Sequence, residues 1–206
     1  MQLSASEAAR IVSGSVEGAY EVSLTGAEVD SRRVRPGDLF VALRGARSDG
    51  HAFVAAALEV ASAAMVRYDA ELDAIPSGRA LIRVRDPLES YWTLAAWENR
   101  RRDWRVIAVT GSVGKTTTKD ILAELLAARF SVGGTFGNRT STLGLPSEIL
   151  SQPDEVEVFV DRSGGAFNPV LSPDGSRLAF ACEDSGGEEA TRAWLWDPGS
   201  DQRTAL

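Results

Sequence analysis

The feature that most constrains the fold is a glycine-bearing segment between an apolar run and a helix-forming run. Val106-Ile107-Ala108-Val109 is short and rich in β-branched residues, and TGSVGKTTTK follows it directly at residues 110–119. The first run favours a strand, and the residues after Gly-Lys-Thr favour a helix from Thr116 to about Ala128. In a strand–loop–helix unit, backbone N–H groups and the positive helix end point at an anion. The pattern therefore predicts a phosphate-binding loop.

The residue types in this loop indicate which anion it would bind. In such loops the lysine, here Lys115, lies along the β- and γ-phosphates, and the hydroxyl of the next residue, Thr116, binds Mg²⁺. Strict spacing would place glycine at position 109, where this chain has valine, so the loop is the short variant GSVGKT. Only two of the 22 basic residues are lysines, Lys115 and Lys119. Both lysines thus lie in the one motif where a compact positive charge suits a phosphate. Together with the Thr116 hydroxyl, this makes ATP with Mg²⁺ the expected ligand.

The rest of the first 150 residues alternates between strand and helix patterns. A capping box at Ser4–Glu7 opens a short helix that should stop near Gly14, and Asp86-Pro87 opens a longer one. Arg100-Arg101-Arg102 is interpreted as a solvated helix end or linker. The remaining expected elements are a strand at 38–43, a helix at about 52–61, and strands at 63–66 and 80–84. This alternation predicts an α/β fold with mostly parallel strands.

Composition excludes several classes of protein. The net charge is −7, and residues 151–206 carry the whole excess, with 11 acidic and 4 basic residues. No basic stripe is present, which argues against a nucleic-acid partner. Single copies of cysteine (Cys182) and histidine (His51) argue against a disulfide framework and a Cys/His metal cluster. No apolar run approaches the roughly 18 residues of a membrane helix, so a soluble cytoplasmic protein without membrane insertion is expected.

Three separated motifs resemble the Mur ligases, which add amino acids to the cell-wall precursor. VIAV followed by TGSVGKTTTK resembles the ATP loop of this family. Upstream, DSRRVRPGDLFVALRG at residues 30–45 and DGHAF at 49–53 resemble its first domain, which binds the uridine-diphosphate end of the muropeptide. Downstream, Gly137-Asn138 and Gly144-Leu145-Pro146 are similar to the branch that adds D-alanyl-D-alanine to the tripeptide. The resemblance covers about residues 20–151.

The resemblance implies roles for individual residues. Lys115 is implied as the catalytic residue, Thr116 as the metal ligand, and Ser31 and Arg32 as contacts to the diphosphate or uracil. Asn138 would line the ATP or substrate cleft, although Arg139-Thr140-Ser141 replaces the further asparagines common in the family. The implied ATP contacts are Gly111, Ser112, Val113, Gly114, Lys115, Thr116 and Thr117.

The resemblance also implies an organisation into domains. Residues 1–105 would bind the muropeptide, and residues 106–151 would form the start of a P-loop α/β ATP-binding domain. The family's next strand should end in a glutamate that helps to hold Mg²⁺, and Asp161 is the residue that could replace it. The implied partners are UDP-N-acetylmuramoyl-tripeptide and D-alanyl-D-alanine, and a monomer is expected.

The β-rich tail, residues 152–206, differs from this pattern. Its Ser172-Pro173-Asp174-Gly175 turn and the later Ala193-Trp194-Leu195-Trp196-Asp197 are similar to one blade of a WD40-like or periplasmic-type β-propeller. A single blade needs neighbours to bury its faces, so we do not expect an independent domain. The chain is interpreted as a truncated or chimeric ligase front that does not complete the ligation alone.

Three other functions stay open. The first is the related ligase that adds the third residue of the same peptide. The second is an unrelated P-loop kinase or NTPase, against which the motif at residues 30–45 counts. The third is a non-catalytic binding protein whose β-tail docks a partner strand through its open edge.

Overall fold

The computed structural model divides the chain into two compact units. The first comprises residues 1–98 and 149–152, and the second comprises residues 99–148 and 153–206. The structure describes residues 1–45, 48–72, 75–109, 115–134, 143–162, 170–171, 178–183, 191–197 and 202–205, with the backbone alone for Ala108, Lys115 and residues from 161 onward.

The first unit is built on a five-stranded sheet in the order β2-β7-β6-β5-β4. Strands β4 to β7 run parallel, and β2 pairs antiparallel with β7 at the edge. The strands are β2 (Ser15–Gly18), β4 (Gly26–Glu28), β5 (Asp38–Val41), β6 (Ala63–Arg67) and β7 (Ala80–Val84). The predicted α/β class with mostly parallel pairing is confirmed for this sheet.

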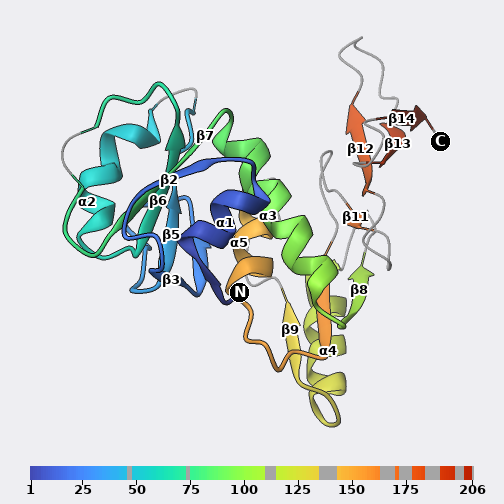
Figure 1. Ribbon diagram of the computed structural model, residues 1–206. Coiled ribbons are helices and arrows are strands. Elements are labelled where there is room, and N and C mark those ends of the chain that lie inside the picture. The colour runs from blue at the N-terminus through green and yellow to red at the C-terminus, as the bar shows by residue number, and fades with distance from the viewer. Residues whose placement is uncertain are drawn as a thin grey trace. The chain divides into compact units, whose positions relative to one another are not determined.

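Helices cover both faces of this sheet. Helix α1 (Ala5–Ile11) packs on β7 and β2, whereas α2 (Val54–Leu58) packs on β6 and β5 from the opposite side, as Figure 1 shows. Successive strand residues point to opposite faces, so both sides of the sheet contribute to a core. The α2 side buries Phe40, Val66 and Leu81, among others. The near-continuous apolar runs of the strands follow from burial on two faces.

The helix starts follow from local sequence signals. The Ser4 hydroxyl oxygen accepts the N–H of Glu7, and the Glu7 carboxylate accepts the N–H of Ser4, which confirms the capping box. Asp86 accepts the N–H groups of Leu88 and Glu89 at the start of α3 (Pro87–Arg101). The helix expected at about 52–61 is shorter. It consists of the 3-10 turn η1 (Gly50–Phe53) followed by α2, and the Asp49 carboxylate caps the start of η1 by accepting the N–H of His51.

The beginning of the chain is tied into the first unit. Strand β1 (Leu3–Ser4) pairs with β3 (Ser23–Leu24), and the Met1 ammonium donates to the carbonyl of Leu150 at 2.6 Å. Leu150 is a fully buried residue near the end of α5 (Gly144–Ser151). The last carbonyls of a helix lack partners inside the helix, so this contact satisfies one of them.

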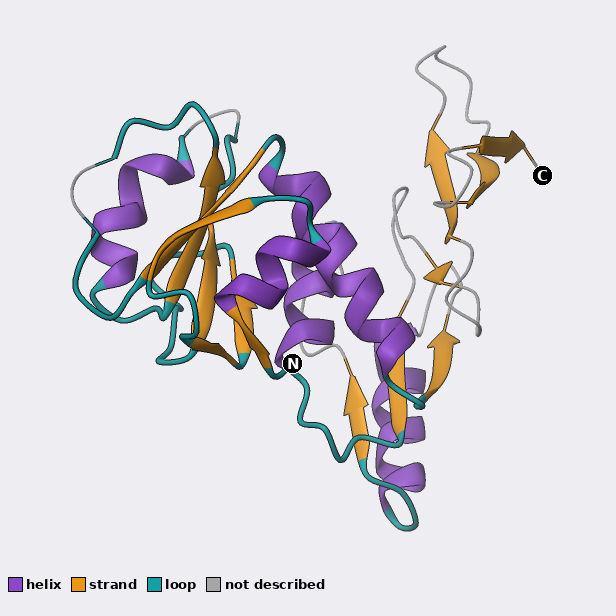
Figure 2. Cartoon of the chain, in the orientation of Figure 1, coloured by secondary structure: helices purple, strands orange, loops and turns teal. Residues whose placement is uncertain are grey.

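The second unit contains a three-stranded parallel sheet in the order β8-β10-β9. Its strands are β8 (Arg105–Val109), β9 (Val132–Gly134) and β10 (Val158–Arg162), and helix α4 (Lys115–Ala127) packs against all three, as Figure 2 shows. This pairing differs from the predicted division after residue 151. Val158, Phe159 and Val160 are buried, and they form the central strand beside β8 rather than part of the tail.

The remaining described strands form a four-stranded antiparallel sheet in the order β11-β12-β13-β14. They are β11 (Val170–Leu171), β12 (Leu178–Glu183), β13 (Thr191–Asp197) and β14 (Gln202–Ala205). Each strand pairs with the next one along the chain. Over the ranges that the structure describes, no helix is both long and apolar enough to cross a membrane.

Candidate functional site

The predicted phosphate loop lies between two described elements. Residues 110–114 and Asn138 lie outside the described residues, as does the side chain of Lys115. Strand β8 ends at Val109 and α4 begins at Lys115, which is the strand–loop–helix order that the sequence predicts. Thr116 and Thr117 are exposed in the first turn of α4. Their position at the positive end of a helix is suited to an anion.

Asp161 lies at the same sheet edge as the loop. In the parallel pairing of β8 and β10, Asp161 is the partner of Ala108, and Arg162 is the partner of Val109. The carboxyl ends of both strands therefore meet beside the start of the loop. A threonine hydroxyl and a carboxylate are oxygen ligands of the kind that Mg²⁺ prefers, so these residue types fit the implied ion.

Lys119 is a buried basic residue of α4. Its side chain is 6% exposed, and Nζ lies 2.9 Å from Oδ1 of Asp120. It follows Lys115 by one helical turn. The sequence analysis noted the spacing of the two lysines but predicted no role for Lys119. The rarity of lysine in this chain was the signal that could have pointed to it.

The other predicted site residues lie in the first unit, in the turn that follows β4. The Glu28 carboxylate accepts the N–H groups of Val29 and Asp30 at 2.9 and 3.2 Å. Asp30 in turn accepts the backbone N–H of Arg32, and its carboxylate pairs with the Arg32 guanidinium at 2.9 and 2.7 Å. Ser31, half-buried, lies between these two residues. Glu28 was not among the predicted site residues, and its place two residues before the polar Asp30-Ser31 turn is the sequence signal that could have found it.

The electrostatics of this turn favour ionised Asp30. The hydrogen bond from the Arg32 side chain is the main cause that lowers the pKa of Asp30 to about 2, and burial opposes it. The Arg32 side chain is 87% exposed. A guanidinium has five N–H donors, and the pair with Asp30 uses two of them. Arg32 therefore keeps donors for an anionic ligand, and the pair fixes its orientation.

A second organised turn holds His51. Its Nε2 accepts the backbone N–H of Arg67 at 3.1 Å, and its Nδ1 lies 2.6 Å from Oδ1 of Asp49. An accepting Nε2 carries no proton, so the network assigns the proton to Nδ1, which donates to Asp49. Asp49 also accepts from Arg44 at 2.9 Å. The pKa of Asp49 lies well below its usual range. The hydrogen bond from the backbone N–H of His51 is the largest cause, and the hydrogen bonds from the His51 ring and from Arg44 add to it.

These contacts give His51 a structural role. Both ring nitrogens are engaged, and the side chain is only 13% exposed. The ring joins the end of β6 to the turn that opens η1.

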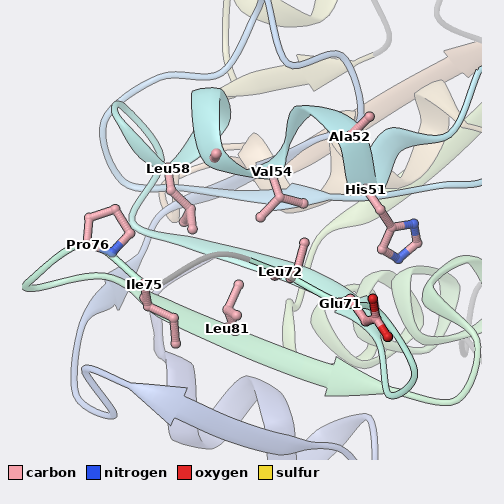
Figure 3. A pocket seen from close by; sticks show the side chains of 10 residues that line it. His51, Ala52, Val54, Leu58, Glu71, Leu72, Ile75, Pro76 and Leu81 are labelled. Atoms are coloured by element: carbon pink, nitrogen blue, oxygen red, sulfur yellow. The ribbon is translucent and has the colours of Figure 1, made fainter.

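A pocket of about 490 Å³ lies on the α2 side of the sheet, and Figure 3 shows its lining. Most of its lining residues are of apolar type, and His51 and Glu71 are its ionisable lining residues. Ser31 and Arg32 do not line it. The lining residues are His51, Ala52, Val54, Ala55, Leu58, Glu71, Leu72, Ile75, Pro76 and Leu81.

Comparisons with known families match a segment of each unit. Residues 23–88 match the model described as "Mur ligase family, catalytic domain", and residues 109–161 match the "Mur ligase middle domain". Over these two segments the chain belongs to the Mur ligase family. The match to the middle domain extends through β10, as does the strand pairing.

Individual relatives agree with the match to the Mur ligase family models. A UDP-N-acetylmuramoyl-tripeptide--D-alanyl-D-alanine ligase of Bacillus subtilis is 39% identical over 139 residues, covering 68% of this chain and 30% of that protein. A 2,6-diaminopimelate-adding ligase of Syntrophomonas wolfei is 38% identical over 144 residues, covering 68% and 27%. The chain thus spans about a third of the length of the curated relatives that it matches.

Solved structures share the fold. A MurF crystal structure from Acinetobacter baumannii superposes with a TM-score of 0.71 at 28% identity, covering 82% of this chain and 36% of that one. A Thermotoga maritima MurF ligase in complex with ADP gives 0.56 at 37% identity, covering 68% and 32%. The Thermotoga protein is thus a similar chain with a bound adenine nucleotide.

Proposed function

We propose that this chain is the front portion of an ATP-dependent ligase that adds D-alanyl-D-alanine to UDP-N-acetylmuramoyl-tripeptide. The observation that carries the proposal is the position of each motif in the fold. The 30–45 motif forms the ordered turn after β4 and the strand β5, and Lys115-Thr116 opens α4, which packs on the parallel strands β8 and β10. The Bacillus and Thermotoga relatives support the substrate and the nucleotide.

The first unit would bind the uridine-nucleotide end of the muropeptide. Ser31 and the free donors of Arg32 would contact the diphosphate or uracil, while Asp30 and Glu28 hold their turn in place. The guanidinium is planar and carries several N–H donors, which suits paired phosphate oxygens. The pre-formed turn would reduce the entropy that is lost when the ligand binds.

The second unit would bind the phosphates of ATP. Backbone N–H groups of residues 111–114 would surround them, Lys115 would offset their negative charge, and Thr117 would complete the contacts. Thr116 and Asp161 are the residues that would hold Mg²⁺, which would supply further charge neutralisation at the phosphates. In the proposed ligation the γ-phosphoryl group passes to a peptide carboxylate, and the amine of D-alanyl-D-alanine displaces phosphate from the acyl phosphate.

The four-stranded tail would be a propeller-type blade fused to this ligase front. The sequential antiparallel order β11-β12-β13-β14 supports that assignment, as does the turn motif at residues 172–175. We propose that residues 1–105 form the muropeptide-binding domain, as the sequence predicts. A partial ATP-binding domain follows, and it includes β10 in addition to the predicted residues 106–151. We further propose a cytoplasmic monomer.

Titration calorimetry of the 206-residue chain tests the proposal. ATP with Mg²⁺ should bind weakly. Lys115→Ala should abolish this binding and Lys115→Arg should largely do so, because a planar fork does not replace an ammonium. Arg129→Ala, an exposed change near the end of α4, is the matched control. Binding by Lys115→Ala at the wild-type affinity would contradict the assignment.

A second titration separates the alternatives. UDP-N-acetylmuramoyl-tripeptide should bind the wild type and bind Ser31→Ala more weakly, with Ser77→Ala as the control. A P-loop kinase or NTPase would bind ATP but no uridine nucleotide. The ligase that adds the third residue would prefer the muropeptide one residue shorter. The Syntrophomonas relative makes this second candidate worth the comparison.

A further inference from the structure

Two groups of the proposed ATP site lie on different strands. The phosphate loop follows β8, whereas Asp161 lies near the end of β10. Their alignment therefore depends on the register of these two strands, in which Val106 is the partner of Phe159 and Ala108 is the partner of Asp161. A slip of one residue would move Asp161 by about 3.3 Å along the sheet. A metal ligand does not tolerate an error of that size.

The strand sequences themselves specify this register weakly. Residues 106–109 are all apolar, and so are residues 158–160. Alternation of polar and apolar residues normally fixes the register, because a slip of one residue exposes the apolar set. Here a slip would leave apolar residues opposite apolar residues. Contacts other than the pairing of β8 with β10 itself are therefore needed to fix the register.

Such contacts are present where β8 and β10 begin. The Arg102 side chain is 4% exposed, which corrects the expectation of a solvated run for this residue, whereas Arg100 and Arg101 are exposed. Its guanidinium donates to the carbonyl of Pro153 and lies 3.3 Å from the Asp154 carboxylate. Pro153 and Asp154 precede β10, so Arg102 connects the approach to β8 with the approach to β10.

Trp104 makes the second connection. Its ring centroid lies 4.8 Å from the guanidinium carbon of Arg102 and 4.9 Å from the ring centroid of Phe159 in β10. Its Nε1 donates to Oδ1 of Asn99 at 3.0 Å in a buried hydrogen bond. Phe159 is itself 2% exposed. The indole is therefore held by three neighbours, and one of them is a residue of β10.

We propose that Arg102 and Trp104 are positioning residues that set the β8–β10 register and thereby align the phosphate loop with Asp161. The alignment of the loop with Asp161 matters only if the proposed function is correct. The claim that Arg102 and Trp104 set the register does not depend on that function. The backbone N–H of Arg105 donates to the carbonyl of Glu157 at 2.9 Å, directly beside the clamp of Arg102, Trp104 and Asp154. The clamp thus acts where the ladder of β8 and β10 starts.

The residue types explain why this clamp is selective. A guanidinium can donate to a carbonyl and a carboxylate in its plane while an indole ring stacks on its face. A shift of β10 by one residue would remove the carbonyl of Pro153, the carboxylate of Asp154 and the ring of Phe159 from these positions together. Three contacts of different chemistry would be lost at once, so the clamp favours one register.

The test uses the full chain with Arg102→Gln, Arg102→Lys and Asp154→Asn. Arg101→Gln is the matched control, because Arg101 also contacts the Asp154 carboxylate, at 3.2 Å, from a more exposed position. NMR cross-strand NOEs between backbone protons of β8 and β10 report the register directly. Calorimetry then measures ATP affinity with Mg²⁺ and with chelator.

Wild type and Arg101→Gln should show one set of NOEs that matches the pairing of Val106 with Phe159. Arg102→Gln should weaken that set or add a second one. The gain in ATP affinity from Mg²⁺ should fall at least fivefold, with the affinity in chelator unchanged within twofold. Should Arg102→Gln fail to fold, Arg102→Lys and Asp154→Asn carry the test, since each keeps part of the clamp.

The outcomes are distinguishable. A single wild-type set of NOEs in all folded clamp variants would overturn the inference, whatever ATP does. Wild-type chain that binds no ATP would contradict the proposed function, and the NOEs would still decide the register. A shifted register with an unchanged effect of Mg²⁺ would overturn the claim that the clamp aligns the loop with Asp161.

Discussion

His51 accepts the backbone N–H of Arg67 through Nε2, and its Nδ1 donates to Asp49. One ring therefore links the end of β6 to the turn that opens η1, the helical segment that precedes this strand. Loop geometry depends on such links, because loops are more mobile than the strands and helices that they connect. The stability of this link can be measured separately from ligand binding.

Replacing His51 tests this link. His51→Ala should lower the free energy of unfolding by about 1–3 kcal/mol, because it leaves the Arg67 N–H without its acceptor. His51→Gln should cost less, since its side-chain oxygen can still accept that N–H. Urea denaturation measures both. Unchanged stability together with lost uridine-nucleotide affinity would instead make His51 a ligand contact.

Asp30→Asn tests the turn that carries Ser31 and Arg32. The pKa of Asp30 is lowered, to about 2, so its ionised form stabilises the folded state at pH values above its unfolded value near 3.9. This contribution should be lost as the pH falls from 4 towards 2. Because the pair with Arg32 is largely exposed, the difference at pH 7 should be no more than about 1 kcal/mol. Denaturation curves of both proteins at several pH values check the sign.

Asp38→Asn should show the opposite pH dependence. Burial raises the pKa of Asp38, a hydrogen bond from the N–H of Arg35 opposes the shift, and the charge of Glu28 adds to it. Above its raised pKa the ionised carboxylate therefore costs stability, and this cost is relieved as the pH falls towards the unfolded value. The wild type should gain stability relative to Asp38→Asn when the pH falls from 7 to 4. A constant difference across that range would contradict the assignment.

Gly134→Ala tests the pairing of β9 with β10. A Cβ at Gly134 would overlap the carbonyl oxygen of Val160, its partner in the ladder. The strands would have to separate, at a cost of about 1–3 kcal/mol. Gly45→Ala is a suitable comparison, because its nearest neighbour, the Ser48 carbonyl oxygen, is 3.3 Å from the added carbon. Thermal melting should show a large loss for the first variant and a small one for the second.

The features that the sequence predicted best are local in the chain. The capping box at Ser4 and the Asp86-Pro87 start of α3 depend on residues within one helical turn, and both are confirmed. Strands β5, β6 and β7 were identified because each is an apolar run that includes β-branched residues. The phosphate loop and Asn138 lie outside the described residues and stay predictions.

Features that depend on distant partners could not be predicted in this way. The run Val132-Gly133-Gly134 has no strand signal, and it forms β9 only because β10 lies beside it. Arg102 was interpreted as solvated because charge runs usually are, yet the carbonyl of Pro153 and the ring of Trp104 bury it. In both cases the deciding contacts are tertiary, and most of them come from residues far along the chain.

The central position of β10 has a consequence for how the second unit forms during synthesis. Strands β8 and β9 both pair with β10 and not with each other. Neither can complete its ladder until residues 158–162 have left the ribosome, although β8 is made some fifty residues earlier. Until then, two strands have unpaired edges, which is a state prone to aggregation. A truncation after residue 151 would make that transient state permanent, so a useful fragment that contains this parallel sheet must extend through Arg162.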